Sequence, residues 1–180
     1  MALRTILTDK DPSLHKHCRP VTSFDGRLHD LIDDLKETLA EAGGAGLAAP
    51  QIGILRRVAI VVDGQEEMVE LVNPEIIAKE GEVDGFEGCL SVPDRWGKVV
   101  RPQYVTVRAQ DRNGAFFQVE GEELIARCFC HELEHLDGVV FSDHTDQLLS
   151  GVELDEMLAG EEAGEQGGKR RRRRKERRGR

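Results

Sequence analysis

The sequence predicts an α+β fold in which antiparallel sheets pack around one central helix. Apolar residues recur at helical spacing in two separate segments, whereas the segment between them consists of short, β-branched runs. Long helices and strands do not alternate along the chain, which argues against a doubly wound parallel sheet. At 180 residues the chain suits one folded domain and is long enough to bury a core.

Two long helices and one short helix are predicted. The first follows "SFDG" and stops at Gly43 and Gly44, and its apolar face comprises Leu28, Leu31, Ile32, Leu35 and Leu39. The second runs from about Glu122 to Gly138, with a broad face made of Leu124, Ile125, Cys128, Glu132 and His135. A short last helix is expected around Val152 to Leu158.

Six short strands are predicted between the two long helices. Each run is bounded by Gly, Pro, Asp or Asn, and "RNG" before Ala115 is a hairpin signal. The runs read "RRVAIVVD", "MVELVNP", "EIIAKEGEV", "GKVVRP", "YVTVRAQD" and "AFFQVEG". The middle of the chain is therefore expected to form the sheets.

Charge divides the chain into two parts. The formal net charge is −9, yet "KRRRRRKERRGR" at the end holds ten basic residues and one acidic residue, so this segment carries +9 and the rest −18. Such a block repels itself, so we expect a domain of residues 1–162 followed by a disordered basic tail, 163–180. Clustered arginines bind RNA phosphates, so the tail is interpreted either as a contact with the ribosome or its RNA or as a merely solvated segment.

No feature of the sequence indicates a membrane or secreted protein. No apolar run approaches the roughly 20 residues that a membrane span needs. We therefore expect a cytoplasmic protein with no membrane partner. Its four cysteines, Cys18, Cys89, Cys128 and Cys130, are then predicted to be thiols or metal ligands rather than disulfides.

The stretch "CHELEHLDG" in the second helix has the pattern of a metal site. Residues four apart on a helix lie about 6 Å from each other, so His131 and His135 can bind one cation. Glu132 lies beside them, where a carboxylate can take a proton from water. The competing interpretation is an exposed helix that contains this pattern by chance.

The third ligand of such a site is open on the residues alone. Catalytic metals usually keep three protein ligands and one free position. Cys89 in "FEGCLSVP" is one candidate, and Cys128, one helical turn before His131, is the other. Cys130 points about 100° away around the helix. Free cysteines are more often packing residues, and we expect the same of His15, His17, His29 and His144.

A third stretch, "GGAGLAAPQIG" from Gly43 to Gly53, is rich in small residues. Small residues let a ligand or another chain approach the backbone closely. Gln51 adds an amide donor that can polarise a carbonyl group. Taken alone, the stretch also suits a tight helix-to-strand connection.

Three stretches together resemble the motifs of the peptide deformylase family in their order and separation. They are "GAGLAAPQ" (Gly44–Gln51), "EGCLS" (Glu87–Ser91) and "HELEH" (His131–His135). The resemblance extends from "ILTDKDPSLHK" to about Phe141 and excludes the basic tail. It implies a hydrolase that removes the formyl group from the N-formylmethionine of nascent polypeptides and releases formate.

The resemblance also implies roles for individual residues. Cys89, His131 and His135 are expected to hold the metal, which is Fe²⁺ in the cell, with Ni²⁺, Co²⁺ or Zn²⁺ able to replace it. Glu132 is expected to be the general acid and base. The amide of Gln51 and the backbone N–H of Leu90 are expected to stabilise the oxyanion.

Substrate contacts follow from the same resemblance. The peptide backbone is expected to lie along two segments, one comprising Gly44, Ala45 and Gly46 and the other Glu87 and Gly88. Arg101 is expected to reach the substrate chain. Leu124 and Cys128 are expected to line the methionine pocket.

Four residues depart from the family pattern. Glu134 replaces the usual Asp of the helix motif, and Cys130 replaces the usual Gln. Ala45 and Arg127 stand where large aliphatic residues are common, giving the pocket a smaller wall and a charged rim. We therefore expect a weaker penalty for bulkier or polar first residues.

Two other functions are compatible with parts of the sequence. An HExxH endopeptidase would cleave peptides without a formyl group and gives Cys89 no role. A non-catalytic, metal-stabilised protein that binds RNA or the ribosome through its tail would need four protein ligands and would leave no free position on the metal.

Overall fold

The computed structural model describes residues 2–160 of the chain. It contains two long α-helices, α1 (Gly26–Ala42) and α2 (Glu123–Leu136). Three 3₁₀ turns are also present: η1 (Pro12–His15) before α1, η2 (Ala49–Ile52) after β1, and η3 (Phe141–His144) after α2. Asp25 caps α1 by accepting hydrogen bonds from the backbone N–H groups of Arg27 and Leu28, and Gly43 ends it in the left-handed conformation. The predicted first helix is therefore confirmed, with its stop signal.

A five-stranded antiparallel sheet forms the larger layer, in the order β1-β2-β3-β6-β7. Its strands are β1 (Gly46–Ala48), β2 (Val58–Val62), β3 (Met68–Glu80), β6 (Tyr104–Gln110) and β7 (Phe116–Glu122). The hairpin expected at "RNG" joins β6 to β7. The short strand β1 was not predicted, because its Gly- and Ala-rich sequence has no β-branched residue.

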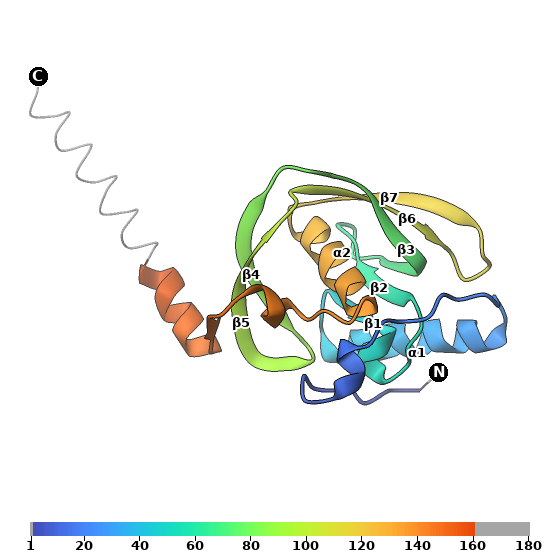
Figure 1. Ribbon diagram of the computed structural model, residues 1–180, viewed down its shortest axis with the longest axis horizontal. Helices are drawn as coiled ribbons and strands as arrows, with labels where there is room; N and C mark the ends of the chain where they lie inside the picture. The colour runs from blue at the N-terminus through green and yellow to red at the C-terminus, as the bar shows by residue number, and fades with distance from the viewer. Residues whose placement is uncertain (1, 161–180) are drawn as a thin grey trace, which may run out of the picture.

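The two strands predicted on either side of Pro74 are one strand. β3 continues through this proline because the register with β6 shifts between Val72 and Glu75, so the missing N–H falls at an irregularity in the ladder. Asn73 adopts a positive φ of 50° there, and its side chain exchanges hydrogen bonds with both backbone groups of Val21. Beyond this point β3 arches over α2, as Figure 1 shows.

A smaller antiparallel sheet has the order β4-β5-β8, with bounds Val83–Cys89, Val92–Arg101 and Leu148–Leu149. The strand predicted at "GKVVRP" begins earlier than expected, at Val92, and pairs with the strand that ends at Cys89. This hairpin curves around one side of α2 (Figure 1).

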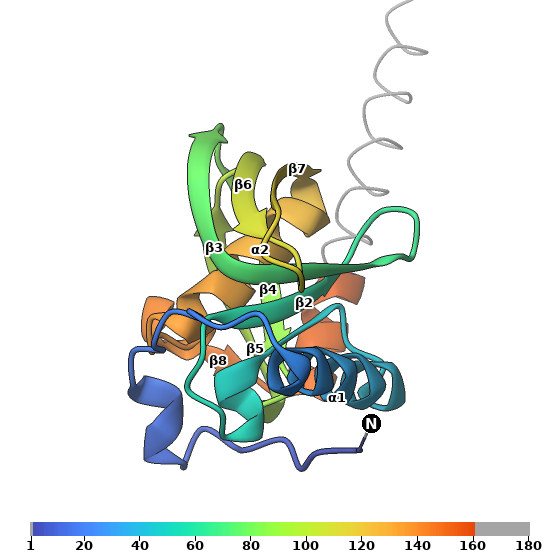
Figure 2. The same cartoon turned by 90° about the vertical axis from the view of Figure 1, so that its right-hand side faces the viewer.

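Helix α2 occupies the centre of the molecule, and the predicted α+β class with antiparallel sheets is confirmed. Its Ala126, Phe129 and Leu133 pack against the inner face of the five-stranded sheet, in a cluster that also contains Cys18 and Cys130. Helix α1 lies along the other side of β2, where Figure 2 shows it below the sheet. Helix α2 is thus held between the two sheets.

The end of the described chain is helical over residues 151–160, as predicted, and no helix among residues 2–160 is long and apolar enough to cross a lipid bilayer. The expected domain boundary at residue 163 and the basic tail 163–180 lie outside the described residues.

Candidate active site

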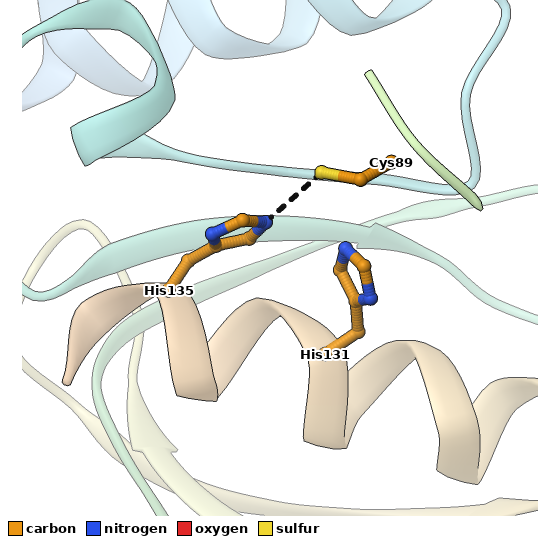
Figure 3. Close-up of side chains that lie close together, drawn as sticks. All are labelled: Cys89, His131 and His135. Carbon is orange, nitrogen blue, oxygen red and sulfur yellow. Dashed lines mark hydrogen bonds between the residues drawn. The ribbon is translucent and has the colours of Figure 1, made fainter. Parts of the chain in front are cut away.

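Three side chains with metal-ligating atoms meet beside α2. His131 and His135 lie one turn apart with ring centroids 4.9 Å from each other, and Cys89 approaches them from the end of β4. One ligand atom from each of the three lies within 4.8 Å of the others, and Cys89 Sγ lies 3.2 Å from His135 Nε2. Figure 3 shows both rings rising from α2 toward the sulfur atom.

The local structure around Cys89 directs donors to its sulfur. β4 ends in a tight turn, and the backbone N–H of Ser91 points back to Cys89 Sγ at 3.4 Å. Gln51 contributes its Nε2 at 3.5 Å, while its Oε1 accepts a hydrogen bond from the backbone N–H of Ala48. The thiolate is the form of cysteine that binds metals, and its sulfur can accept hydrogen bonds from both of these donors.

Glu87 fixes the orientation of His131. Its carboxylate accepts hydrogen bonds from His131 Nδ1 at 3.0 Å and from Arg101 Nε at 2.7 Å and Nη2 at 3.0 Å. Burial opposes the charge, but the hydrogen bonds from His131 and Arg101 outweigh it and lower the pKa of Glu87 to about 2. A proton held on Nδ1 leaves Nε2 of His131 free as a ligand atom.

Glu132 lies beside the cluster and is 4% exposed. Burial, with a contribution from the charge of Glu87, raises the pKa of Glu132 to about 7, against the opposing effect of His131. Among the described residues its Oε2 has no hydrogen-bond partner. The carboxylate fits here because residue 46 is glycine: a Cβ on Gly46 would lie 2.5 Å from Glu132 Oε1.

The donor set fits a divalent metal ion. Two buried imidazoles and a cysteine surrounded by donors match a site with three protein ligands, and the carboxylate of Glu132 lies next to it without a partner. Cys128 is not part of this group. Burial and the nearby Glu132 raise the pKa of Cys128 to about 12, so its thiol stays protonated.

A cavity of about 550 Å³ opens beside the cluster. Four segments form its wall: residues 43–46, which lead into β1, residues 86–90 at the end of β4, residues 92–96 of β5, and the face of α2 that carries Leu124, Cys128 and Glu132. Gln51 and Arg127 also contribute to the wall. Apart from His135 and Arg101, the predicted site residues therefore border one cavity.

The expected position of Arg101 is wrong. Its side chain is 4% exposed and does not line the cavity, because its guanidinium is held by Glu87 and, at 2.5 Å, by Glu134. Glu134 in turn receives a hydrogen bond from His144 Nε2 at 2.9 Å. Arg101 therefore holds the Glu87 carboxylate by hydrogen bonds and does not reach into the cavity toward a substrate chain.

The charged rim expected from Arg127 is also absent. Arg127 is 7% exposed, and its guanidinium donates to Glu87 Oε1 and to the backbone carbonyls of Val83, Gly85 and Val99. The family resemblance had placed Arg127 at the edge of the methionine pocket. Only the tertiary contact with β4 and β5 turns its charge inward.

Several residues of the site were missed by the sequence analysis, and three of them make defined contacts there. Ser91 is fully buried and its Oγ accepts a hydrogen bond from Gln51 Nε2 at 3.2 Å. Phe141 stacks on His131 with a centroid distance of 6.0 Å. Trp96 lines the cavity where its ring covers Gly88, whose added Cβ would lie 2.9 Å from the ring. Ser91 alone had a signal, since it belongs to "EGCLS".

Comparison with known proteins agrees with this geometry. The family model of polypeptide deformylase matches residues 3–150. The chain belongs to the polypeptide deformylase family. A peptide deformylase of Caldicellulosiruptor bescii is 52% identical over 156 residues, covering 87% of this chain and 93% of the relative. One from Agathobacter rectalis is 50% identical over 152 residues, covering 84% of this chain and 96% of the relative.

Solved peptide deformylases share the fold. The crystal structure of the Legionella pneumophila enzyme superimposes with a TM-score of 0.77 at 41% identity, covering 89% of this chain and 98% of the other. That of Thermotoga maritima gives 0.78 at 35% identity, covering 82% of this chain and 100% of the other. The chain is therefore a metal-dependent hydrolase that removes the formyl group from nascent polypeptides. The endopeptidase and the non-catalytic function have no support from these similarities.

Proposed function

We propose that Cys89, His131 and His135 hold a divalent cation and that Glu132 carries the proton in the hydrolysis of N-formylmethionyl polypeptides. The observation that supports this most is the meeting of three ligand atoms within 4.8 Å beside a buried carboxylate that has no partner among the described residues. Fe²⁺ is the proposed cellular metal, with Ni²⁺, Co²⁺ or Zn²⁺ as substitutes, because thiolate and imidazole ligands suit all four. When bound, the cation supplies Lewis acidity for water and for the formyl oxygen.

Glu132 moves one proton twice in this scheme. It accepts a proton from the attacking water as the new C–O bond forms at the formyl carbon. It then donates that proton to the amide nitrogen as the C–N bond breaks, so the products are formate and a peptide with a free amino group. Its carboxylate lies against Gly46 in the wall of the cavity, which supports this role.

Gln51 and Leu90 are proposed to stabilise the negative charge that develops on the formyl oxygen. The hydrogen bond from Ala48 to Gln51 Oε1 fixes the amide so that Nε2 faces the cysteine and the cavity. Leu90 lines the same cavity directly after Cys89, so its backbone N–H is the second proposed donor.

The peptide is proposed to add as a strand between two sheet edges. β1 is the edge of the larger sheet and β4 is the edge of the smaller one, and residues of both line the cavity. The first side chain then enters between Ala45, Leu124 and Cys128. Because the charge of Arg127 is turned inward, the predicted tolerance of bulkier first residues rests on Ala45 alone.

Cys89→Ser and Glu132→Ala test this proposal, with Cys128→Ser as the matched control. We expect Cys89→Ser to lose metal, and Glu132→Ala to keep metal but release no formate from a formyl-Met-Ala-Ser peptide. Cys128→Ser should keep its metal, because Cys128 does not belong to the ligand group. Metal content and formate are measured on the same anaerobic samples. Full metal content in Cys89→Ser would remove Cys89 from the ligand set.

Ribosome contact through the basic tail stays a prediction, since residues 163–180 lie outside the described structure. A cytoplasmic location also stays a prediction. Clustered arginines would bind ribosomal RNA in a salt-dependent manner. Unchanged co-sedimentation with ribosomes at low salt after deletion of the tail would contradict the contact.

A further inference from the structure

We propose that Arg127 is a positioning residue for metal retention, which joins the helix that carries both histidines to the hairpin that carries Cys89. This inference rests on the proposed metal site. It adds a residue whose guanidinium binds neither the metal nor the substrate. Arg127 lies on α2, one turn before His131, and points toward β4 and β5.

The guanidinium of Arg127 donates hydrogen bonds to four acceptors in this position. Nη1 donates to Glu87 Oε1 at 2.9 Å, to the carbonyl of Val99 at 2.8 Å and to that of Gly85 at 3.3 Å. Nη2 donates to the carbonyl of Val83 at 3.0 Å. Its four acceptors lie on two strands, β4 and β5, and this number of acceptors suits the several donors of a guanidinium better than the single ammonium of lysine.

Glycine at position 85 makes room for this side chain. A Cβ on Gly85 would lie 2.8 Å from Arg127 Nη2 and 3.1 Å from Cζ. The guanidinium therefore packs directly on the backbone of β4. The strand cannot shift along α2 without breaking these hydrogen bonds, and β4 ends at Cys89.

Glu87 connects Arg127 to the metal site. Its Oε1 accepts from Arg127 and from Arg101 Nε, while its Oε2 accepts from Arg101 Nη2 and from His131 Nδ1. Arg127 thus helps to fix the rotation of the carboxylate that orients His131. Removal of a carboxylate that orients a metal-binding histidine commonly changes metal affinity by roughly 10- to 100-fold, and Arg127 acts on this carboxylate from one contact further out.

Removal of Arg127 does not leave Glu87 without a partner, because Arg101 and His131 still hold it. We therefore expect Arg127→Met to fold and to place Cys89 and His131 less accurately. Methionine keeps an unbranched apolar stem in the cavity wall but offers no donor. Arg127→Lys keeps one charge near Glu87 and should fall between Arg127→Met and the unchanged protein.

The test is a titration of the full-length apoprotein with Co²⁺ in the presence of a competing chelator. Binding is measured by the absorption band that appears when a thiolate binds cobalt. We expect Arg127→Met to raise the Kd for Co²⁺ by about 10-fold, the lower end of the range for a residue that contacts a ligand directly. Arg112→Met is the control, because Arg112 also binds two carboxylates, Glu70 and Asp33, but none of its partners belongs to the metal site. It should leave the Kd unchanged. Urea unfolding of each apoprotein separates weaker metal binding from loss of fold.

A double-mutant cycle with Glu87→Gln distinguishes positioning from a general structural role. If Arg127 acts through Glu87, the double variant should bind Co²⁺ about as weakly as Glu87→Gln alone. An unchanged Kd in Arg127→Met and Arg127→Lys would overturn the role of Arg127. Fully additive effects in the cycle would overturn its action through Glu87. If the unchanged protein gave no thiolate-to-cobalt absorption, the proposed metal site would be overturned, and this inference with it.

Discussion

Gly46→Ala tests whether the position of Glu132 is essential. Gly46 begins β1, its φ is not in the left-handed region, and alanine is sterically acceptable for its backbone. Its new Cβ would, however, lie 2.5 Å from Oε1, 2.7 Å from Cγ and 2.8 Å from Cδ of Glu132. The whole carboxylate group, and not one flexible tip, must therefore move.

The size of that movement sets the expected loss. Ordinary contact with a Cβ begins at 3.4 Å, so Glu132 must retreat by about 1 Å. A misplacement of that size at a catalytic group costs about 100-fold in rate, or about 2.7 kcal/mol of transition-state stabilisation. We expect kcat to fall by about this factor while the metal ligands stay in place.

The assay is formate release from formyl-Met-Ala-Ser under saturating peptide, with the metal content of each sample measured. Gly26→Ala is the matched control, because a Cβ on Gly26 would meet nothing within 4 Å. It should keep the kcat of the unchanged protein. Unchanged kcat in metal-loaded Gly46→Ala would refute the reasoning that Glu132 must remain where it lies.

Two further predictions concern stability rather than chemistry. Leu35 is fully buried on α1. Leu35→Ala should lower the free energy of unfolding, measured with urea, by about 2–5 kcal/mol and leave kcat unchanged. A smaller loss would mean that the surrounding core closes around the missing side chain. Burial opposes ionisation of Glu70, but hydrogen bonds from Arg112 and Lys36 outweigh it and lower the pKa of this carboxyl. Its ionised form therefore stabilises the fold above its unfolded pKa, and this stabilisation is lost as pH falls through the lower folded pKa. Urea unfolding should show Glu70→Gln less stable than the unchanged protein at about pH 6, with the difference shrinking toward about pH 3, whereas a constant difference would contradict this assignment.

Local patterns predicted the helices well because their signals lie within a few residues. The apolar face of α1 and its Gly43 stop are both local features, and each is present in the structure. The spacing of His131 and His135 likewise determines that both rings leave the same side of a helix. Such features depend on backbone geometry and need no information about the rest of the chain.

Strand boundaries were predicted less well because pairing determines them. Pro74 normally ends a strand, yet β3 passes through it at a shift in register with β6. β1 has too few β-branched residues to be predicted, but it is paired along β2 from Gly46 to Ala48. In both cases a neighbouring strand supplies the hydrogen bonds that local propensity does not indicate.

The sequence by itself determined the class of the fold, the two histidines with Glu132 on one helix, and a resemblance that pointed to Cys89. The tertiary structure alone decided the direction of the charges around them. Arg101 and Arg127 were expected at the substrate, but both converge on Glu87 because a buried carboxylate needs several donors and β4 brings it against α2. Side-chain direction of this kind depends on which elements meet in space, and residue spacing along the chain does not contain that information.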